Sequence, residues 1–170
     1  MADHDITLTV DDTEESLTVE SRTLLVHALR DQLGYTAPNV GCESGKCGAC
    51  TVSLDGDAVK SCTILAVEAD GSEVRTAGAL ADEAGGELHP IQAAFHEEHG
   101  LQCGYCTPGM LMTTEELLDG NPDPSREAIR RALKGNVCRC TGYGNIVDAV
   151  ETAAERVDAS DRPDSATGDD

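Results

Sequence analysis

The chain has 170 residues, a formal net charge of −20 and few large apolar side chains. Leu, Ile, Val and Phe together number 33, about 19% of the residues. So low a content of these residues, together with a high net charge, is typical of disordered chains. A membrane span is excluded because no run of about 18 apolar residues occurs, and a direct nucleic-acid partner is disfavoured because acidic surfaces repel phosphate. The eight cysteines argue against disorder, since metal sites can hold together a chain with a small core.

The N-terminal segment MADHD is acidic and lacks the apolar region of a secretory signal. We therefore expect a cytoplasmic protein, in a compartment where structural disulfides are disfavoured and thiols bind metals or react. The chain has three lysines against nine arginines, and its carboxylates are spread along its whole length. This pattern favours a halophilic cytoplasm over an ordinary acidic bacterial protein, because high salt screens the repulsion between the charges.

The first 80 residues predict an α+β unit in which one helix crosses a sheet. Apolar residues that alternate with polar ones indicate strands, and a three-to-four-residue spacing indicates helix. Asp55-Gly56 is the strongest hairpin signal in the chain. In order, the patterns predict a strand over 6–10, a strand over 16–20, a helix over 25–33, strands over 51–54 and 58–62, and a strand over 74–76.

From about residue 82 the pattern becomes helical. The spacing predicts four short helices, which form a four-helix bundle, with Thr107 as an N-cap before Pro108 and Ser125 as a second N-cap. We expect a first domain over 1–80, a helical domain over 81–157 and an acidic disordered tail over 158–170. The predicted helices cover residues 89–99, 107–118, 125–134 and 145–157.

The first four cysteines follow the plant-type spacing of a [2Fe–2S] cluster, C-x4-C-x2-C and then a distant fourth cysteine. The loop around them is rich in glycine, which lets the backbone approach the sulfurs closely and donate hydrogen bonds. A Cys₄ zinc site usually consists of two close pairs, and two of these cysteines lack a close neighbour. The spacing therefore favours an iron–sulfur cluster held by Cys42, Cys47, Cys50 and Cys62.

The second four cysteines form a C-x2-C pair and a C-x-C pair, with 31 residues between the pairs. Each pair precedes a predicted helix, so two inter-helix loops would bring the pairs together at one end of the bundle. Helix N-termini at that place favour anionic thiolates. The spacing alone leaves zinc and iron–sulfur equally possible for Cys103, Cys106, Cys138 and Cys140.

Three motifs resemble the iron–sulfur subunit of the molybdenum hydroxylases, the family of xanthine dehydrogenase, aldehyde oxidoreductase and aerobic carbon monoxide dehydrogenase. The resemblance covers roughly residues 5–155, and all eight cysteines match. The motifs are GCESGKCGACTV at 41–52, QCGYCTPGM at 102–110 and GNVCRCTGYGNI at 135–146.

The resemblance implies an N-terminal β-grasp ferredoxin-like domain with one [2Fe–2S] cluster, followed by a four-helix domain with a second cluster. It implies that Gln102 and Cys140 face the molybdopterin cofactor of a large partner subunit, and that Cys140 begins the electron path. A subunit that binds FAD is a further expected partner. The implied function is electron transfer in a complex that oxidises carbon monoxide, aldehydes or purines and other N-heterocycles. A free-standing ferredoxin-like shuttle and a zinc-stabilised interaction module are the alternatives.

Other polar clusters in the chain have simpler interpretations. His96 and His99 are three residues apart, whereas the metalloprotease motif needs them four apart, so a solvated helix face is expected. His27 and the remaining histidines belong to no recognisable constellation and are expected to be structural or exposed. The bases Arg126, Arg130 and Lys134 share one helix face. A solvated stripe is favoured there over a docking patch for an acidic partner or the pterin phosphate.

Overall fold

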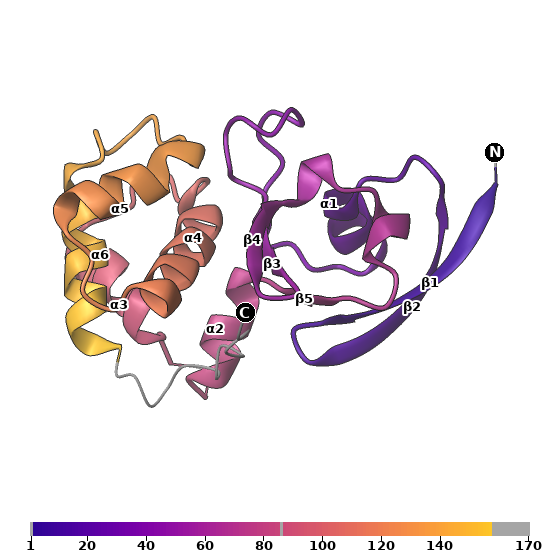
Figure 1. The fold of residues 1–170 in the computed structure, drawn as a ribbon, viewed down its shortest axis with the longest axis horizontal. Coiled ribbons are helices and arrows are strands. Elements are labelled where there is room, and N and C mark those ends of the chain that lie inside the picture. The colour runs from indigo at the N-terminus through magenta and orange to yellow at the C-terminus, as the bar shows by residue number, and fades with distance from the viewer. Residues whose placement is uncertain (1, 86, 158–170) are drawn as a thin grey trace, which may run out of the picture.

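The structure is a computed structural model and describes residues 2–85 and 87–157. It has the α+β architecture expected from the sequence, with a sheet region beside a group of helices (Figure 1). The acidic segment 158–170, predicted as a disordered tail, lies outside the described residues.

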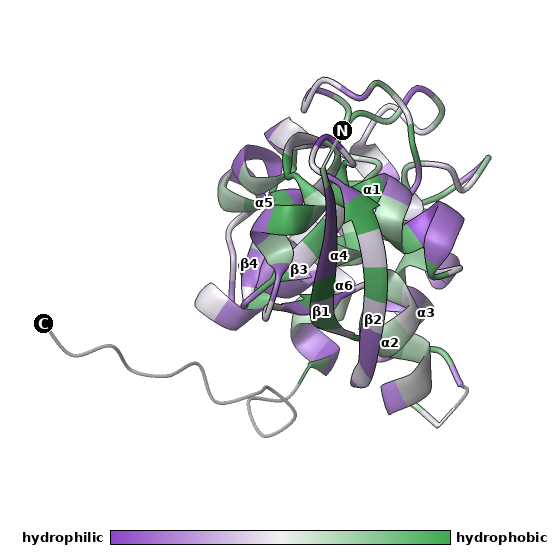
Figure 2. Cartoon of the chain, turned by 90° about the vertical axis from the view of Figure 1, so that its right-hand side faces the viewer, coloured by the Kyte–Doolittle hydropathy of each residue, from purple (hydrophilic) through white to green (hydrophobic). Residues whose placement is uncertain are grey.

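Five strands form one sheet with the order β2-β1-β5-β3-β4. Strands β1 and β5 are parallel, whereas the other neighbouring pairs are antiparallel. Alternation along β1 buries Ile6, Leu8 and Val10, and the same alternation of hydrophobic and hydrophilic residues is visible on β2 (Figure 2). The strands are β1 (Asp3–Val10), β2 (Thr13–Glu20), β3 (Thr51–Leu54), β4 (Asp57–Lys60) and β5 (Glu73–Arg75).

The turn between β3 and β4 confirms the predicted hairpin. Asp55 and Gly56 have φ values of 52° and 94°, so both central residues are in the left-handed region that a tight two-residue hairpin requires. The two strands then pair in register from Thr51 with Lys60 to Leu54 with Asp57. This hairpin places Cys50 and Cys62 at the same end of the sheet.

The helix predicted over 25–33 is only partly α-helical. Helix α1 is confined to Leu25–His27, and the chain continues as a wider π-type turn over Ala28–Gln32. Its apolar face is buried against the sheet, as the spacing predicted, because Leu25, Ala28 and Leu29 are fully buried.

One further prediction about local structure was wrong, and one helix was missed. Cys62 lies in a 3-10 turn over Ser61–Thr63 rather than on the strand, because the Ser61 N–H and hydroxyl both bind the Cys50 carbonyl and turn the chain inward. Helix α2 (Ala77–Glu83) was not predicted, since its small residues give little hydrophobic periodicity.

The helical region contains the four predicted helices, packed around one hydrophobic core. Ser125 is confirmed as an N-cap, since its Oγ accepts a hydrogen bond from the Ala128 N–H at 3.3 Å. Thr107 is not an N-cap: it is the first residue of its helix, and Cys106 occupies the cap position. None of the described helices is long and apolar enough to cross a membrane. The helices are α3 (Pro90–Glu97), α4 (Thr107–Gly120), α5 (Arg126–Ala132) and α6 (Gly144–Arg156).

Helix α4 connects the two regions, because it packs against β3 and β4 (Figure 1). Arg75 on β5 forms ion pairs with Glu83 on α2 and with Glu115 on α4, the second at 2.6 Å. The Glu116 carboxylate on α4 also accepts a hydrogen bond from the Ala58 N–H at 2.9 Å. These polar contacts fix α4 on the half of the sheet formed by β5, β3 and β4.

Replacing the single phenylalanine tests the helical core. Phe95 is 1% exposed and packs among the buried residues of α3, α4 and α6. Phe95→Ala should lower the free energy of unfolding by about 3–5 kcal/mol, because the lost apolar contacts leave a cavity. Leu88→Ala is the control, since Leu88 is 55% exposed and its truncation should change stability by less than about 0.5 kcal/mol. Guanidinium unfolding curves for the two variants would contradict the packing if they coincided.

Candidate metal centres

Three cysteines of the first set lie on a loop that wraps tightly between α1 and β3, and the fourth, Cys62, follows β4. Gly45 and Gly48 have φ values of 72° and 71°, and Glu43 has a φ of 49°, so three loop residues adopt the left-handed conformation. At Gly41 a Cβ atom would stand 2.7 Å from the Cys47 Sγ. The expected role of small residues is thus visible in the structure, because glycine here makes room for a thiol.

The four thiols of the first set differ in exposure. Cys42 is exposed, whereas Cys50 and Cys62 are buried and form a small cluster with Val26. The Cys42 Sγ accepts a hydrogen bond from the Cys47 N–H at 3.3 Å. The Cys42 and Cys47 side chains also form a hydrogen bond with each other, as do those of Cys50 and Cys62, so the four sulfurs form a more exposed pair and a buried pair.

The second cysteine set is paired across its two motifs. The Cys140 thiol donates to the Cys103 Sγ at 3.5 Å, and the Cys106 and Cys138 thiols also form a hydrogen bond. The structure thus brings together the two inter-helix loops, as the sequence predicted. The sequence did not predict which cysteines pair. The first cysteine of the C-x2-C motif, Cys103, pairs with the last cysteine of the C-x-C motif, Cys140.

Both arrangements fit a cluster of two irons, each of which takes two thiolates. Among the described residues, no three His, Cys, Asp or Glu side chains are grouped so that they could hold a single metal ion. The thiols are instead arranged two by two.

The electrostatics of the thiols also suits a bound cation. Hydrogen bonds from the Ser44 side chain and the Cys47 N–H lower the pKa of Cys42 to about 6. Burial raises the pKa of Cys50 to about 11 and that of Cys106 to about 12. Because burial disfavours an isolated thiolate, these inner thiols need the positive charge of a metal to ionise at neutral pH.

One buried hydroxyl beside the second set lacks a partner in the described part of the chain. The Thr107 Oγ1 is buried and makes no hydrogen bond within it, although buried hydroxyls are normally paired. Thr107 follows Cys106 directly. A group bound by the four thiols would supply an acceptor, because the sulfurs of an iron–sulfur cluster accept hydrogen bonds. The Thr141 Oγ1 already lies 3.3 Å from the Cys138 Sγ.

A hydrogen bond joins the two sets. The Val137 N–H donates to the Cys47 carbonyl at 2.7 Å, and Val137 directly precedes Cys138. Asn136 is 3% exposed, and its amide donates to the Gly48 carbonyl at 3.1 Å. Sequence reasoning missed Asn136, because its role depends on contacts 88 residues apart.

His27 was expected to be structural or exposed, and the structure gives it a specific role. Its Nδ1 lies 3.0 Å from the Asp31 carboxylate and its Nε2 lies 2.5 Å from that of Glu43, the residue after Cys42. Hydrogen bonds with Glu43 and, to a smaller extent, with Asp31 raise the pKa of His27. The sequence gives no signal for a contact between His27 and Glu43, which are 16 positions apart.

The residues expected to face a partner's pterin lie at the surface. Gln102, Cys103 and Cys140 are exposed, as is Val137 at 52%. In the basic stripe, Arg126 forms ion pairs with Asp148 and Glu151 on α6, which agrees with a solvated stripe at that position.

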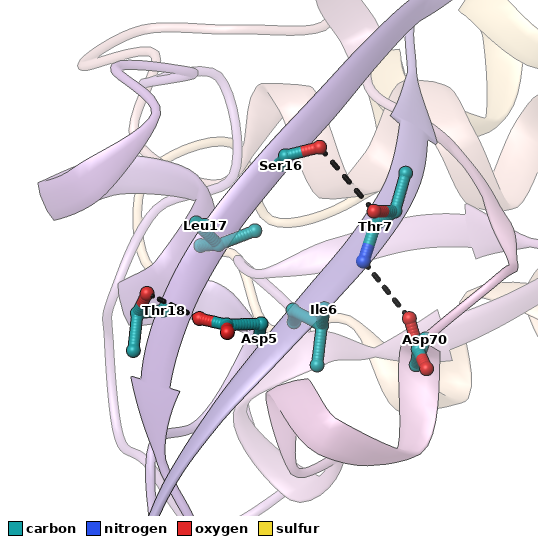
Figure 3. Close-up of a pocket in the computed structure, with 7 residues that line it drawn as sticks. All are labelled: Asp5, Ile6, Thr7, Ser16, Leu17, Thr18 and Asp70. Atoms are coloured by element: carbon teal, nitrogen blue, oxygen red, sulfur yellow. Dashed lines mark hydrogen bonds between the residues drawn. The ribbon is translucent and has the colours of Figure 1, made fainter.

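A shallow cavity of about 500 Å³ lies away from both cysteine sets, on the β1–β2 hairpin. Figure 3 shows its lining, in which the Asp70 carboxylate accepts a hydrogen bond from the Thr7 N–H and the Asp5 carboxylate accepts one from Thr18. Its lining includes no cysteine. The chemistry of the chain is therefore to be sought in the thiols rather than in this cavity.

Comparisons with known families agree with the two cysteine sets. A family described as a 2Fe-2S iron-sulfur cluster binding domain matches residues 8–81, and one described as a [2Fe-2S] binding domain matches residues 76–151. The chain is 48% identical over 157 residues to caffeine dehydrogenase subunit gamma of Pseudomonas sp. (strain CBB1), covering 91% of this chain and 93% of that protein. It is 45% identical over 153 residues to the nicotine 6-hydroxylase small subunit of Paenarthrobacter nicotinovorans, covering 90% and 91%.

Solved structures show the same similarity. The crystal structure of quinoline 2-oxidoreductase from Pseudomonas putida 86 matches with a TM-score of 0.86 and 42% identity, covering 90% of this chain and 94% of that chain. Aldehyde oxidoreductase from Desulfovibrio gigas matches with a TM-score of 0.82 and 44% identity, covering 89% of this chain but only 17% of that much longer chain.

The unpaired hydroxyl yields a prediction about the second cysteine set. If Thr107 donates to a cluster sulfur, Thr107→Val should lower the reduction potential of that cluster by roughly 40 mV, which corresponds to about 1 kcal/mol for one electron. Thr107→Ser should retain the potential. Thr114→Val is the matched control, because the Thr114 hydroxyl is buried in the same helix but donates to the Met110 carbonyl. An EPR-monitored redox titration with equal potentials for Thr107→Val and wild type would contradict this assignment.

Proposed function

Because the chain belongs to the family of small iron–sulfur subunits of molybdenum hydroxylases, we propose that it binds two [2Fe–2S] clusters and relays electrons between partner subunits. The observation that carries this proposal is the arrangement of all eight thiols in two sets of two pairs. When bound, each cluster supplies a site that accepts and releases one electron. The alternatives, a free-standing shuttle and a zinc-stabilised module, are disfavoured by the relatives, which are named as subunits of dehydrogenases and hydroxylases.

In this proposal each pair of thiols would bind one iron. The more exposed pair of each set would hold one iron and the more buried pair the other, so that each cluster presents one edge toward the surface. The Cys47 N–H and the Thr107 and Thr141 hydroxyls would stabilise the sulfurs. The first cluster is assigned to Cys42, Cys47, Cys50 and Cys62, and the second to Cys103, Cys106, Cys138 and Cys140.

We also propose that the second cluster faces a large subunit that holds molybdopterin. The exposure of Gln102, Cys103 and Cys140 supports a surface that a partner covers. From there, the hydrogen bond between the Val137 N–H and the Cys47 carbonyl offers a short covalent and hydrogen-bonded route to the first cluster. A flavin subunit that binds FAD would receive the electrons at the exposed Cys42 edge.

The reaction class follows from the family rather than from a pocket on this chain. We propose that the complex oxidises an N-heterocycle or an aldehyde, with water as the source of oxygen. The relatives named after caffeine, nicotine, quinoline and aldehydes support these two substrate classes. Carbon monoxide is a third substrate that the motif resemblance implies, and purines belong to the N-heterocycles.

The boundaries and the location of the protein are part of the same proposal. We propose a first domain over 1–80 and a helical domain over 81–157, in a cytoplasmic protein of a halophile. The family matches, 8–81 and 76–151, are compatible with a division near residue 80. The net charge of −20 supports a high-salt cytoplasm, where screening reduces the self-repulsion.

The test of the function is to purify the chain together with the subunits encoded beside it. The complex should contain molybdenum, and addition of an N-heterocycle or aldehyde should bleach the visible absorption of the iron–sulfur clusters. Purification of the chain alone with iron and sulfide would support the shuttle instead. Zinc without acid-labile sulfide would support the zinc module.

The ligand assignment predicts that the two clusters can be removed separately. Wild-type protein should contain about four irons and four acid-labile sulfides, since each of two clusters has two of each. Cys50→Ser should remove the first cluster signal from the EPR spectrum of the reduced protein and leave the second. Cys106→Ser should do the reverse, because the two sets share no ligand. One variant that removed both signals, or neither, would contradict the assignment.

A further inference from the structure

Three glycines from distant parts of the chain meet between the two cysteine sets. Gly48 lies in the first cysteine loop, Gly109 in the first turn of α4, and Gly135 just before the second C-x-C motif. At Gly48 an added Cβ would stand 2.4 Å from the Gly135 carbonyl oxygen. At Gly109 an added Cβ would stand 2.0 Å from the Gly48 carbonyl oxygen. The three backbones therefore approach more closely than side chains would allow.

The Gly48 carbonyl at the centre of this contact is held firmly. It accepts hydrogen bonds from the Thr51 N–H at 3.1 Å, the Thr51 hydroxyl at 2.7 Å and the Asn136 amide at 3.1 Å. The Asn136 Oδ1 in turn accepts a hydrogen bond from the Thr113 hydroxyl on α4 at 3.1 Å. Because these groups are buried, moving the carbonyl would leave several polar atoms unpaired.

Helix α4 must therefore move away from the Gly48 carbonyl if Gly109 gains a side chain. Real Cβ atoms essentially never approach another atom within 3.0 Å, so a methyl group at Gly109 requires a separation at least 1 Å greater than the present 2.0 Å. Gly109 is three residues after Cys106, and Gly48 is next to Cys47. A retreat of α4 would thus move ligands of the second cluster away from ligands of the first.

We infer that the contact between Gly109 and the Gly48 carbonyl sets the spacing of the two clusters, which makes Gly109 a positioning residue for electron transfer between them. The inference rests on the proposed function, since it needs both clusters. Electron transfer and the magnetic interaction between two reduced clusters both weaken with distance. Alanine forms helices better than glycine, so helix formation does not explain the glycine at position 109. The spacing of the clusters does explain it.

The test compares alanine substitutions at three glycines in the protein loaded with both clusters. Gly109→Ala should keep about four irons per chain but reduce the spin–spin splitting in the low-temperature EPR spectrum of the fully reduced protein. Gly120→Ala is the matched control, because Gly120 lies in the same helix and has open space around it. At Gly135 the added Cβ meets only the flexible end of Lys60, at 2.8 Å, so Gly135→Ala should also keep the splitting.

The outcomes separate this inference from the proposed function. A wild-type protein without iron and sulfide would overturn the proposed function itself. Gly109→Ala with both clusters and an unchanged splitting would overturn the spacing inference alone. If Gly109→Ala fails to fold, Asn136→Ala decides, because without adding an atom it removes the side chain that links the Gly48 carbonyl to Thr113 on α4. A reduced splitting supports the inference, and a wild-type splitting overturns it.

Discussion

The close contact between the first cysteine loop and the segment before the second C-x-C motif is the constraint on which the rest of the structure depends. Its centre is the hydrogen bond of 2.7 Å from the Val137 N–H to the Cys47 carbonyl. Around this contact α4 lies on β3 and β4, and glycine is needed at positions 48 and 109, where an added Cβ would stand 2.4 Å and 2.0 Å from a backbone oxygen. The arrangement of sheet and helices is therefore the arrangement that brings two sets of thiols together.

The acidic composition explains why so much depends on these loops. The chain buries two modest cores, one around β1 and α1 and one among the helices, while it carries a net charge of −20. Thiols whose pKa is raised by burial, such as the buried Cys50 and the half-buried Cys106, resist ionisation on their own, so they contribute most to stability when a metal is bound. Cluster binding and folding are then coupled in the proposed function.

Some local signals in the sequence were reliable and others, such as the Thr107 cap, were not, whereas contacts between distant segments were not visible in it. The Asp55-Gly56 turn and the Ser125 cap were predicted because each depends on a few neighbouring residues. The cysteine sets were predicted from spacing and then from family resemblance. The missed features, such as the His27 link to Glu43 and the Asn136 bond to Gly48, join residues that only the folded chain brings together.

The most direct test of the account is the order in which the clusters are reduced in the assembled complex. Rapid-freeze EPR after mixing with substrate should show the signal of the second cluster before that of the first, because Cys103 and Cys140 form the surface proposed to meet the molybdopterin subunit. The Cys50→Ser and Cys106→Ser variants identify which signal belongs to which cluster. Reduction of the first cluster before the second, or reduction by dithionite but never by substrate, would contradict the account.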